Sequence, residues 1–177
     1  MDNDLYKKWS AISEKSNDIL ELEKKTLYSP VLVLNYDNKE LPYIGQFNYC
    51  QNEKNSDYHS FTIDFYEKSK ADNVKNQHEF INTKLLTKRA VEGRDYLSSF
   101  SYLNETIHLK TSYGYYSYLI ETDLLDFLIK TSKTCKDNEV IKFEIRIGML
   151  EGDRVISADI PLVNLKNALK EAIVKDK

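Results

Sequence analysis

The residues that could bind a metal or transfer a proton are few, and their spacing suits neither task. The chain has three histidines, His59, His78 and His108. None stands in H-x-x-x-H or H-E-x-x-H spacing, which would put two ligands on one helix face. Cys50 and Cys135 are too far apart in sequence for a metal-binding pair. Two reduced thiols are the plainer interpretation, and a disulfide between them stays open. The sequence predicts no metal site and no cofactor.

The sequence gives little support for a nucleophilic or nuclease active site either. Cys50 and His59 flank a polar loop, but the alternation of the flanking strands puts them on opposite faces, out of hydrogen-bond reach. Asp64, Glu67 and Lys68 come nearest to the carboxylate-and-lysine cluster of a metal-dependent nuclease. Asp64 and Glu67 are separated by an odd number of positions on a predicted strand, so they point to opposite faces.

Motifs that cradle phosphates or present a catalytic serine are missing from the sequence. It contains no G-x-x-x-x-G-K-[ST], G-x-G-x-x-G or G-x-S-x-G pattern, and it has only five glycines. An unrecognised hydrolase or nuclease stays an alternative. The chemistry-bearing residues nevertheless favour a non-catalytic protein.

Positive charge is concentrated in one segment, residues 68–94. The segment holds seven Lys or Arg against three Asp or Glu, an excess of four on a chain whose net charge is −3. We take Lys84, Lys88, Arg89 and Arg94 as candidate binding residues for an acidic protein surface or a phosphate backbone. The alternative is a solvated helix face, which is the usual role of such a run.

Tyrosines gather around Gly114 in a chain that has 13 of them. The predicted hairpin puts Tyr113 at its loop and Tyr115 on its outer face. An exposed pair of this kind could anchor a protein partner or stack on nucleic-acid bases. The alternative is a tyrosine-rich sheet whose hydroxyls reach the surface.

Alternating hydrophobic residues predict several antiparallel hairpins. Gly152-Asp153 suits a two-residue loop, and this loop would set Ile145 opposite Ile160 and Ile147 opposite Ala158. Further turns are expected at residues 104–105 and 113–114, and a longer loop after residue 50. The partners these loops imply are Tyr49 with Phe61, Phe47 with Ile63, Phe100 with Leu109, and Leu109 with Tyr118.

Helical spacing predicts an amphipathic helix over 3–25 and a second, less regular one within 67–94. A hairpin followed by a helix is expected twice, at 106–133 and 140–174. Together these patterns predict an α+β fold: a largely antiparallel sheet of about eight strands with N-terminal, central and C-terminal helices. Residues 1–177 are expected to form one domain, with the first helix either part of it or appended to it.

The sequence favours a small cytoplasmic binding protein that acts through protein–protein contact. The first residues lack the basic start and apolar run expected of a signal peptide, and no apolar stretch approaches the roughly 20 residues of a membrane span. The richness in Lys, Asn, Ile and Tyr fits an AT-rich genome, so an inhibitor or accessory protein of a phage or mobile element is one form of this hypothesis. A nucleic-acid-binding module using 68–94 is the alternative, and homo-oligomerisation stays open.

Overall fold

The computed structural model of this chain describes residues 7–14, 24–36, 38–50, 61–67, 95–113, 118–120, 123–149 and 152–173. This part of the chain forms ten strands and two short helices. The strands are β1 (Ser10–Glu14), β2 (Lys24–Tyr28), β3 (Leu32–Tyr36), β4 (Lys39–Cys50), β5 (Phe61–Glu67), β6 (Asp95–Tyr102), β7 (Glu105–Tyr113), β8 (Tyr118–Ile120), β9 (Val140–Met149) and β10 (Gly152–Pro161). The helices are α1 (Asp123–Ser132) and α2 (Leu165–Ala172).

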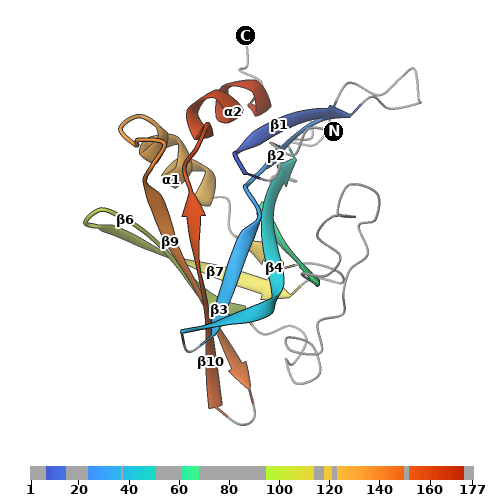
Figure 1. The fold of residues 1–177 in the computed structure, drawn as a ribbon, viewed down its shortest axis with the longest axis vertical. Coiled ribbons are helices and arrows are strands. Elements are labelled where there is room, and N and C mark those ends of the chain that lie inside the picture. The colour runs from blue at the N-terminus through green and yellow to red at the C-terminus, as the bar shows by residue number, and fades with distance from the viewer. Residues whose placement is uncertain are drawn as a thin grey trace.

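The strands form one antiparallel sheet that curls back on itself (Figure 1). Their order is β1-β2-β4-β3-β10-β9-β6-β7-β8-β5, and β5 also pairs with β4. Strand β4 is long, so β2 pairs with its last residues, β3 with its first residues, and β5 along its other edge. The β4–β5 pairing closes a circuit of strands and gives the sheet an inner and an outer face.

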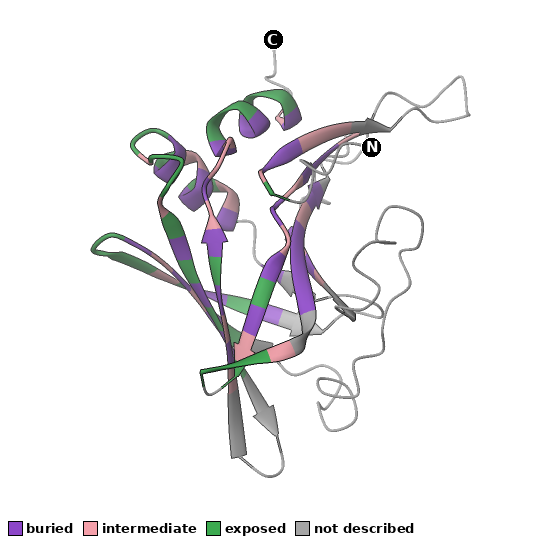
Figure 2. Ribbon diagram, in the orientation of Figure 1, coloured by how far each residue is buried: buried purple, intermediate pink, exposed green. Residues whose placement is uncertain are grey.

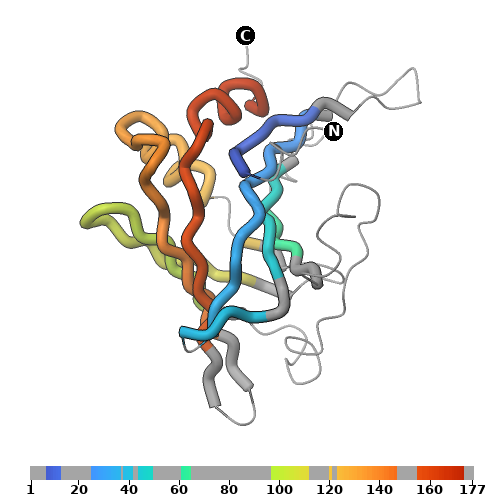
Figure 3. Tube along the Cα trace, viewed as in Figure 1, coloured from blue at the N-terminus to red at the C-terminus, as the bar shows by residue number. Residues whose placement is uncertain are grey.

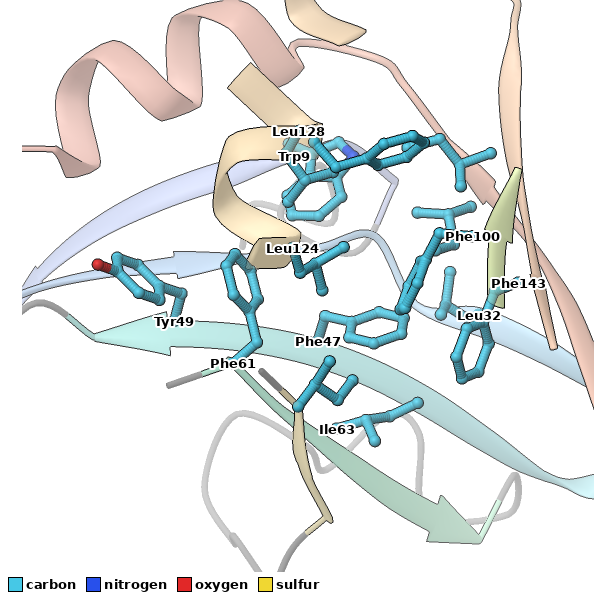
Figure 4. Close-up of a cluster of buried hydrophobic side chains, with 14 of the residues drawn as sticks. Trp9, Leu32, Phe47, Tyr49, Phe61, Ile63, Phe100, Leu124, Leu128 and Phe143 are labelled. Atoms are coloured by element: carbon cyan, nitrogen blue, oxygen red, sulfur yellow. The ribbon is translucent and has the colours of Figure 1, made fainter. Parts of the chain in front are cut away.

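Three phenyl rings from different parts of the curl meet on the inner face (Figure 4). Phe47 lies on β4, Phe100 on β6 and Phe143 on β9, and each ring is buried. The ring centroids of Phe47 and Phe143 are 5.1 Å apart, those of Phe100 and Phe143 5.0 Å, and those of Phe47 and Phe100 5.8 Å. Each such pair contributes about 0.5–1.5 kcal/mol beyond the burial of its area. The rings therefore hold opposite walls of the curl together.

Helix α1 packs its apolar side against the same core. Leu124, Phe127 and Leu128 are buried and belong to the same hydrophobic core, and Figure 4 shows Leu124 near Phe47. Asp123 in the first turn and Lys130 in the last turn match the helix dipole. Both helices lie at the end of the sheet opposite the end at which β9 stops and β10 begins (Figure 1). Neither described helix has the length and apolarity needed to cross a membrane.

The single tryptophan, Trp9, links the first described segment, residues 7–14, to the last, residues 152–173, by hydrogen bonds. Its Nε1 donates a hydrogen bond to the Pro161 carbonyl at 2.7 Å, and its backbone N donates to the Val163 carbonyl at 3.0 Å. In return the Asn164 side-chain amide donates to the Trp9 carbonyl at 3.0 Å. The two segments consequently lie side by side (Figure 3). Asn164 has a φ of 65°, a left-handed conformation that Asn tolerates better than most residues.

Ser29 joins β2 to β3, which lie one after the other along β4. Its backbone N donates to the Phe47 carbonyl at 2.9 Å, and its Oγ accepts the Phe47 backbone N–H at 2.9 Å. The Ser29 hydroxyl therefore accepts the hydrogen bond that a backbone carbonyl would accept in a regular pair of strands. The Ser29 carbonyl instead accepts a hydrogen bond from Gln46 Nε2 at 3.0 Å. This bond gives the NH2 group of Gln46, which is buried, a hydrogen-bond partner.

The predicted α+β fold with N-terminal, central and C-terminal helices is wrong, because the described chain is mainly an antiparallel sheet with two short helices. The helix expected over 3–25 is replaced by β1 and β2 in the described part of that range. Pairing with β4 and the hydrogen bonds of Trp9 override its helical spacing. The helix expected within 67–94 lies outside the described residues. A helix does follow each of the hairpins β7–β8 and β9–β10, as predicted.

One predicted strand register is confirmed and three are wrong. Tyr49 pairs with Phe61 and Phe47 with Ile63, as expected. The β9–β10, β6–β7 and β7–β8 registers each differ from the prediction by an even number of residues. The observed partners are Ile145 with Ile156, Ala158 with Phe143, Phe100 with Ile107, Ser98 with Leu109, and Tyr113 with Tyr118. Ile147 pairs with Arg154. The structure does not describe the side chain of Ile147.

An even shift leaves every side chain on its predicted face, so alternation alone cannot detect it. In β9–β10 the observed register pairs the whole of one strand with the whole of the other. It brings Ile141 opposite Ile160, and it leaves Pro161, which has no backbone N–H, at the last position of the ladder. Gly152 consequently pairs with Met149 instead of forming the turn.

Replacing Phe143 by Ala should destabilise the protein by about 3–5 kcal/mol, because it empties the middle of the aromatic cluster. Urea denaturation would measure this loss. The matched control is Leu97→Ala on β6, where the side chain is 53% exposed and the change should stay within about 0.5 kcal/mol. A similar loss in both variants would contradict the assignment of the core.

Asn164→Ala should destabilise the protein more than Asn164→Gly. Both variants lose the hydrogen bond to Trp9. Only the Ala variant must also hold a residue with a Cβ atom in the left-handed conformation, which costs about 1–2 kcal/mol of folding free energy. Urea denaturation followed by fluorescence would measure the difference, since Trp9 is the single tryptophan. Equal stabilities of the two variants would contradict the left-handed conformation.

Candidate functional site

The candidate binding residues from the sequence fall largely outside the described chain. Lys84, Lys88, Arg89 and Arg94 belong to 68–94, which the structure does not describe, and neither does it describe Tyr115. Tyr113 is the last residue of β7. Asp95, which follows the basic segment in the sequence, pairs with Ser112, which precedes Tyr113.

The acidic residue singled out by the sequence, Asp64, takes part in a polar network between strands. Its Oδ2 accepts a hydrogen bond from Asn48 Nδ2 at 2.7 Å, and Asn48 Oδ1 accepts one from Thr62 Oγ1 at 2.6 Å. The network links β4 and β5 on the outer face, opposite the core residue Phe47. Within the described ranges, no three or more His, Cys, Asp or Glu residues are grouped so that they could hold a metal ion.

A second polar cluster surrounds Glu139 in the turn between α1 and β9. Glu139 Oε1 accepts hydrogen bonds from the Tyr102 hydroxyl at 3.0 Å and from the Lys136 backbone N at 2.7 Å. Burial and the neighbouring Glu139 carboxylate raise the pKa of Tyr102. Burial, Glu139 and Asp137 raise the pKa of the Cys135 thiol. The thiol is thus kept protonated, the opposite of what a nucleophilic cysteine requires.

Four neighbouring strands leave a surface open on the outer face of the sheet. Its first row crosses β7, β6, β9 and β10. Leu97 pairs with Lys110 on one side and with Arg146 on the other, and Arg146 pairs with Val155. We call these four residues the Leu97 row. Leu97, Lys110 and Arg146 are exposed and Val155 is half-buried. Figure 2 shows exposed stretches on the strands β6 and β9.

Two further rows continue this surface along the same strands. In the second row Glu144 pairs with Ser99 and Ser157, and in the third Lys142 pairs with Asp159. Glu144, Lys142 and Asp159 are all exposed. We use the name outer surface for the Leu97 row together with the second and third rows. It mixes charges of both signs with one large exposed apolar side chain.

Reasoning from the sequence missed the Leu97 row. A signal was present, because Leu97 belongs to the polar side of the alternating pattern over residues 96–103. An apolar residue on the polar side of a strand is either covered by another element of the fold or exposed to solvent. Here Leu97 is 53% exposed. Its cationic neighbours lie on other strands, and their positions depend on registers that the alternation did not determine.

The Glu139 cluster should make folding stability depend on pH in the alkaline range. The pKa values of Tyr102 and Cys135 are raised above their ordinary 10.0 and 9.0. The unfolded chain therefore loses these protons first, so stability holds below pH 9.0 and falls as the pH rises through the higher folded values. Urea denaturation at several pH values would measure the fall. It should be shallower in the Tyr102→Phe, Cys135→Ser double variant, and parallel curves would contradict the expectation.

Comparisons with known proteins identify no relative of this chain. No family model matches it, and neither does any curated protein or any solved structure.

Proposed function

We propose that this chain is a non-catalytic binding protein that docks on a protein partner through its outer surface. The observation that carries the proposal is the exposure of Leu97 between two cationic neighbours, Lys110 and Arg146. A large apolar side chain at the centre of an exposed sheet face is a common anchor for a protein partner. The charges around it would set the orientation and the choice of partner.

The described polar clusters support binding better than catalysis. Asp64 is held in a network with Asn48 and Thr62. Glu139 is held by Tyr102 and the backbone of Lys136. Each carboxylate therefore fixes a contact between elements of the fold. An unrecognised hydrolase or nuclease would need a reactive group, and the raised pKa of Cys135 argues against the one described thiol.

The outer surface suits a protein better than a nucleic acid. Glu144 and Asp159 stand among its cations, and carboxylates in such positions repel a phosphate backbone. The nucleic-acid alternative depends on the basic segment 68–94, which ends directly before β6. Richness in Lys, Asn, Ile and Tyr supports a phage or mobile-element origin. In that setting the protein would act in the cytoplasm as an inhibitor or accessory protein.

Leu97→Asp should abolish capture of the partner. The tagged chain would be used to capture proteins from its host, and bound proteins would be quantified by mass spectrometry. Loss of a central apolar anchor costs about 2 kcal/mol or more, which is roughly 30-fold in affinity. The matched control is Val33→Asp on the outer side of β3, where the side chain is 47% exposed. Capture by Leu97→Asp at the level of the control would refute the proposal.

A variant in which Lys84, Lys88, Arg89 and Arg94 are all Glu separates the two classes of partner. If the chain binds nucleic acid, a gel shift with duplex DNA or RNA should be visible, should weaken steeply with added salt, and should vanish in this variant. If the chain binds a protein, the gel shift should be absent. Salt-sensitive nucleic-acid binding that survives Leu97→Asp would overturn the protein-docking proposal.

A further inference from the structure

Strand β1 ends the order of strands in the described sheet and has a neighbouring strand on one side only. It pairs with β2, whereas the β4–β5 pairing closes a circuit that leaves β1 outside it. Helix α2 packs against both β1 and β2, so it lies over a face of this pair of strands. The far edge of β1 is therefore a place where the described sheet can accept a further strand.

The direction of the backbone groups of β1 follows from the hydrogen bonds of Trp9. Its N–H donates to the Val163 carbonyl, and its carbonyl accepts a hydrogen bond from the Asn164 side chain. Both groups consequently point away from β2, toward the far edge. The Val163–Asn164 segment occupies this edge at Trp9, which is the position directly before β1 begins.

The residues that follow Trp9 alternate in direction. Successive residues of a strand turn their N–H and carbonyl groups to opposite edges, and the β1–β2 pairing runs without a register shift. The backbone groups of Ser10 and Ile12 therefore face β2, whereas those of Ala11 and Ser13 face the far edge. Residues 10–13 carry no charge and no proline, the features that commonly keep an edge strand from pairing.

A second copy of β1 matches this edge. Antiparallel strands bond where outward-facing residues meet, and a twofold axis at Ile12 pairs Ala11 of each copy with Ser13 of the other. An axis at Ala11 would instead pair Ser13 with Trp9, where Val163 already occupies the edge. An axis at Ser13 would place Ala11 beyond the end of the opposite strand. The axis at Ile12 thus uses both outward-facing residues and avoids the occupied position.

We propose that two copies of this chain pair through the far edge of β1 about a twofold axis at Ile12. Each pair of Ala11 with Ser13 exchanges both of its N–H···O bonds, and the two Ile12 residues face each other in the closer, non-hydrogen-bonded position. Ile12 is half-buried within one copy, so it retains apolar area that the second copy covers. This interface is separate from the outer surface and does not depend on the proposed docking function.

Sedimentation equilibrium of the full chain tests the proposal. The wild type should show a reversible equilibrium between monomer and dimer without larger species, because a twofold interface is closed. Ile12→Lys should weaken the dimer at least about tenfold, since two like charges then meet at the axis. The matched control is Val33→Lys on β3, where the side chain is 47% exposed, and it should dimerise as the wild type does. A wild type that stays monomeric up to about 1 mM, where even weak complexes form, would overturn the proposal.

A pair of proline variants tests the direction of the backbone groups. Ala11→Pro removes an N–H that faces the far edge, so it should abolish the dimer with little change in melting temperature. Ile12→Pro removes an N–H that bonds to β2 and should lower the melting temperature markedly. Equal melting temperatures, or a dimer that persists in Ala11→Pro, would contradict the proposed pairing.

A disulfide reports the register and separates this interface from the outer surface. In a Cys50→Ser, Cys135→Ser background, Ile12→Cys would place two thiols on residues whose Cα atoms are about 4.5 Å apart, within the range of a disulfide. Mild oxidation should yield a covalent dimer of this variant, and Val33→Cys in the same background should stay monomeric. Leu97→Asp should keep the wild-type dimer. Dissociation by Leu97→Asp but not by Ile12→Lys would place the second copy on the outer surface and overturn the proposal.

Discussion

The contact among Phe47, Phe100 and Phe143 is the interaction on which the rest of this structure depends. Phe100 and Phe143 are paired on the neighbouring strands β6 and β9, whereas Phe47 comes from β4, which is separated from them in the strand order and reaches them because the sheet curls. Their burial in turn stabilises the curl, since an open sheet would expose all three rings to water. The β4–β5 pairing closes the circuit of strands around them, and α1 adds Leu124 and Leu128 to the same core. The inner face is thus filled with side chains.

The proposed docking uses the outer side of the sheet, because the inner side carries the buried hydrophobic core. Both described helices lie at one end, where α2 packs against β1 and β2. The outer surface of β7, β6, β9 and β10 keeps exposed residues in each of its rows. Because these strands are hydrogen-bonded on both edges, the surface is rigid and its side chains are held in a regular array. Under the proposed function, such an array would bind a partner without a large entropic cost of ordering its own side chains.

The candidate site shows where reasoning from residues alone reached its limit. The basic segment 68–94 and Tyr115 were identified by composition, and they lie outside the described residues. The Leu97 row was missed although Leu97 itself interrupts a polar pattern. A row is made of residues from separate strands, so it exists only once the registers of those strands are known. Lys110 and Arg146 are ordinary exposed cations in the sequence, and only their pairing with Leu97 makes them a group.

The sequence by itself determined which residues form most of the strands. Where apolar and polar residues alternate, it also determined which face each side chain takes, because only one of the two faces can then be buried. It also determined the helix that begins at Asp123 and the β4–β5 pairing, where Tyr49 and Phe61 meet as expected. Tertiary structure decided the other registers, since shifts by an even number of residues conserve the buried face and differ only in which partners meet. It also decided that the chain around Trp9 is not helical. Hydrogen bonds from Trp9 to Pro161 and Val163, at the far end of the chain, outweigh a local helical spacing that those distant residues cannot influence before folding.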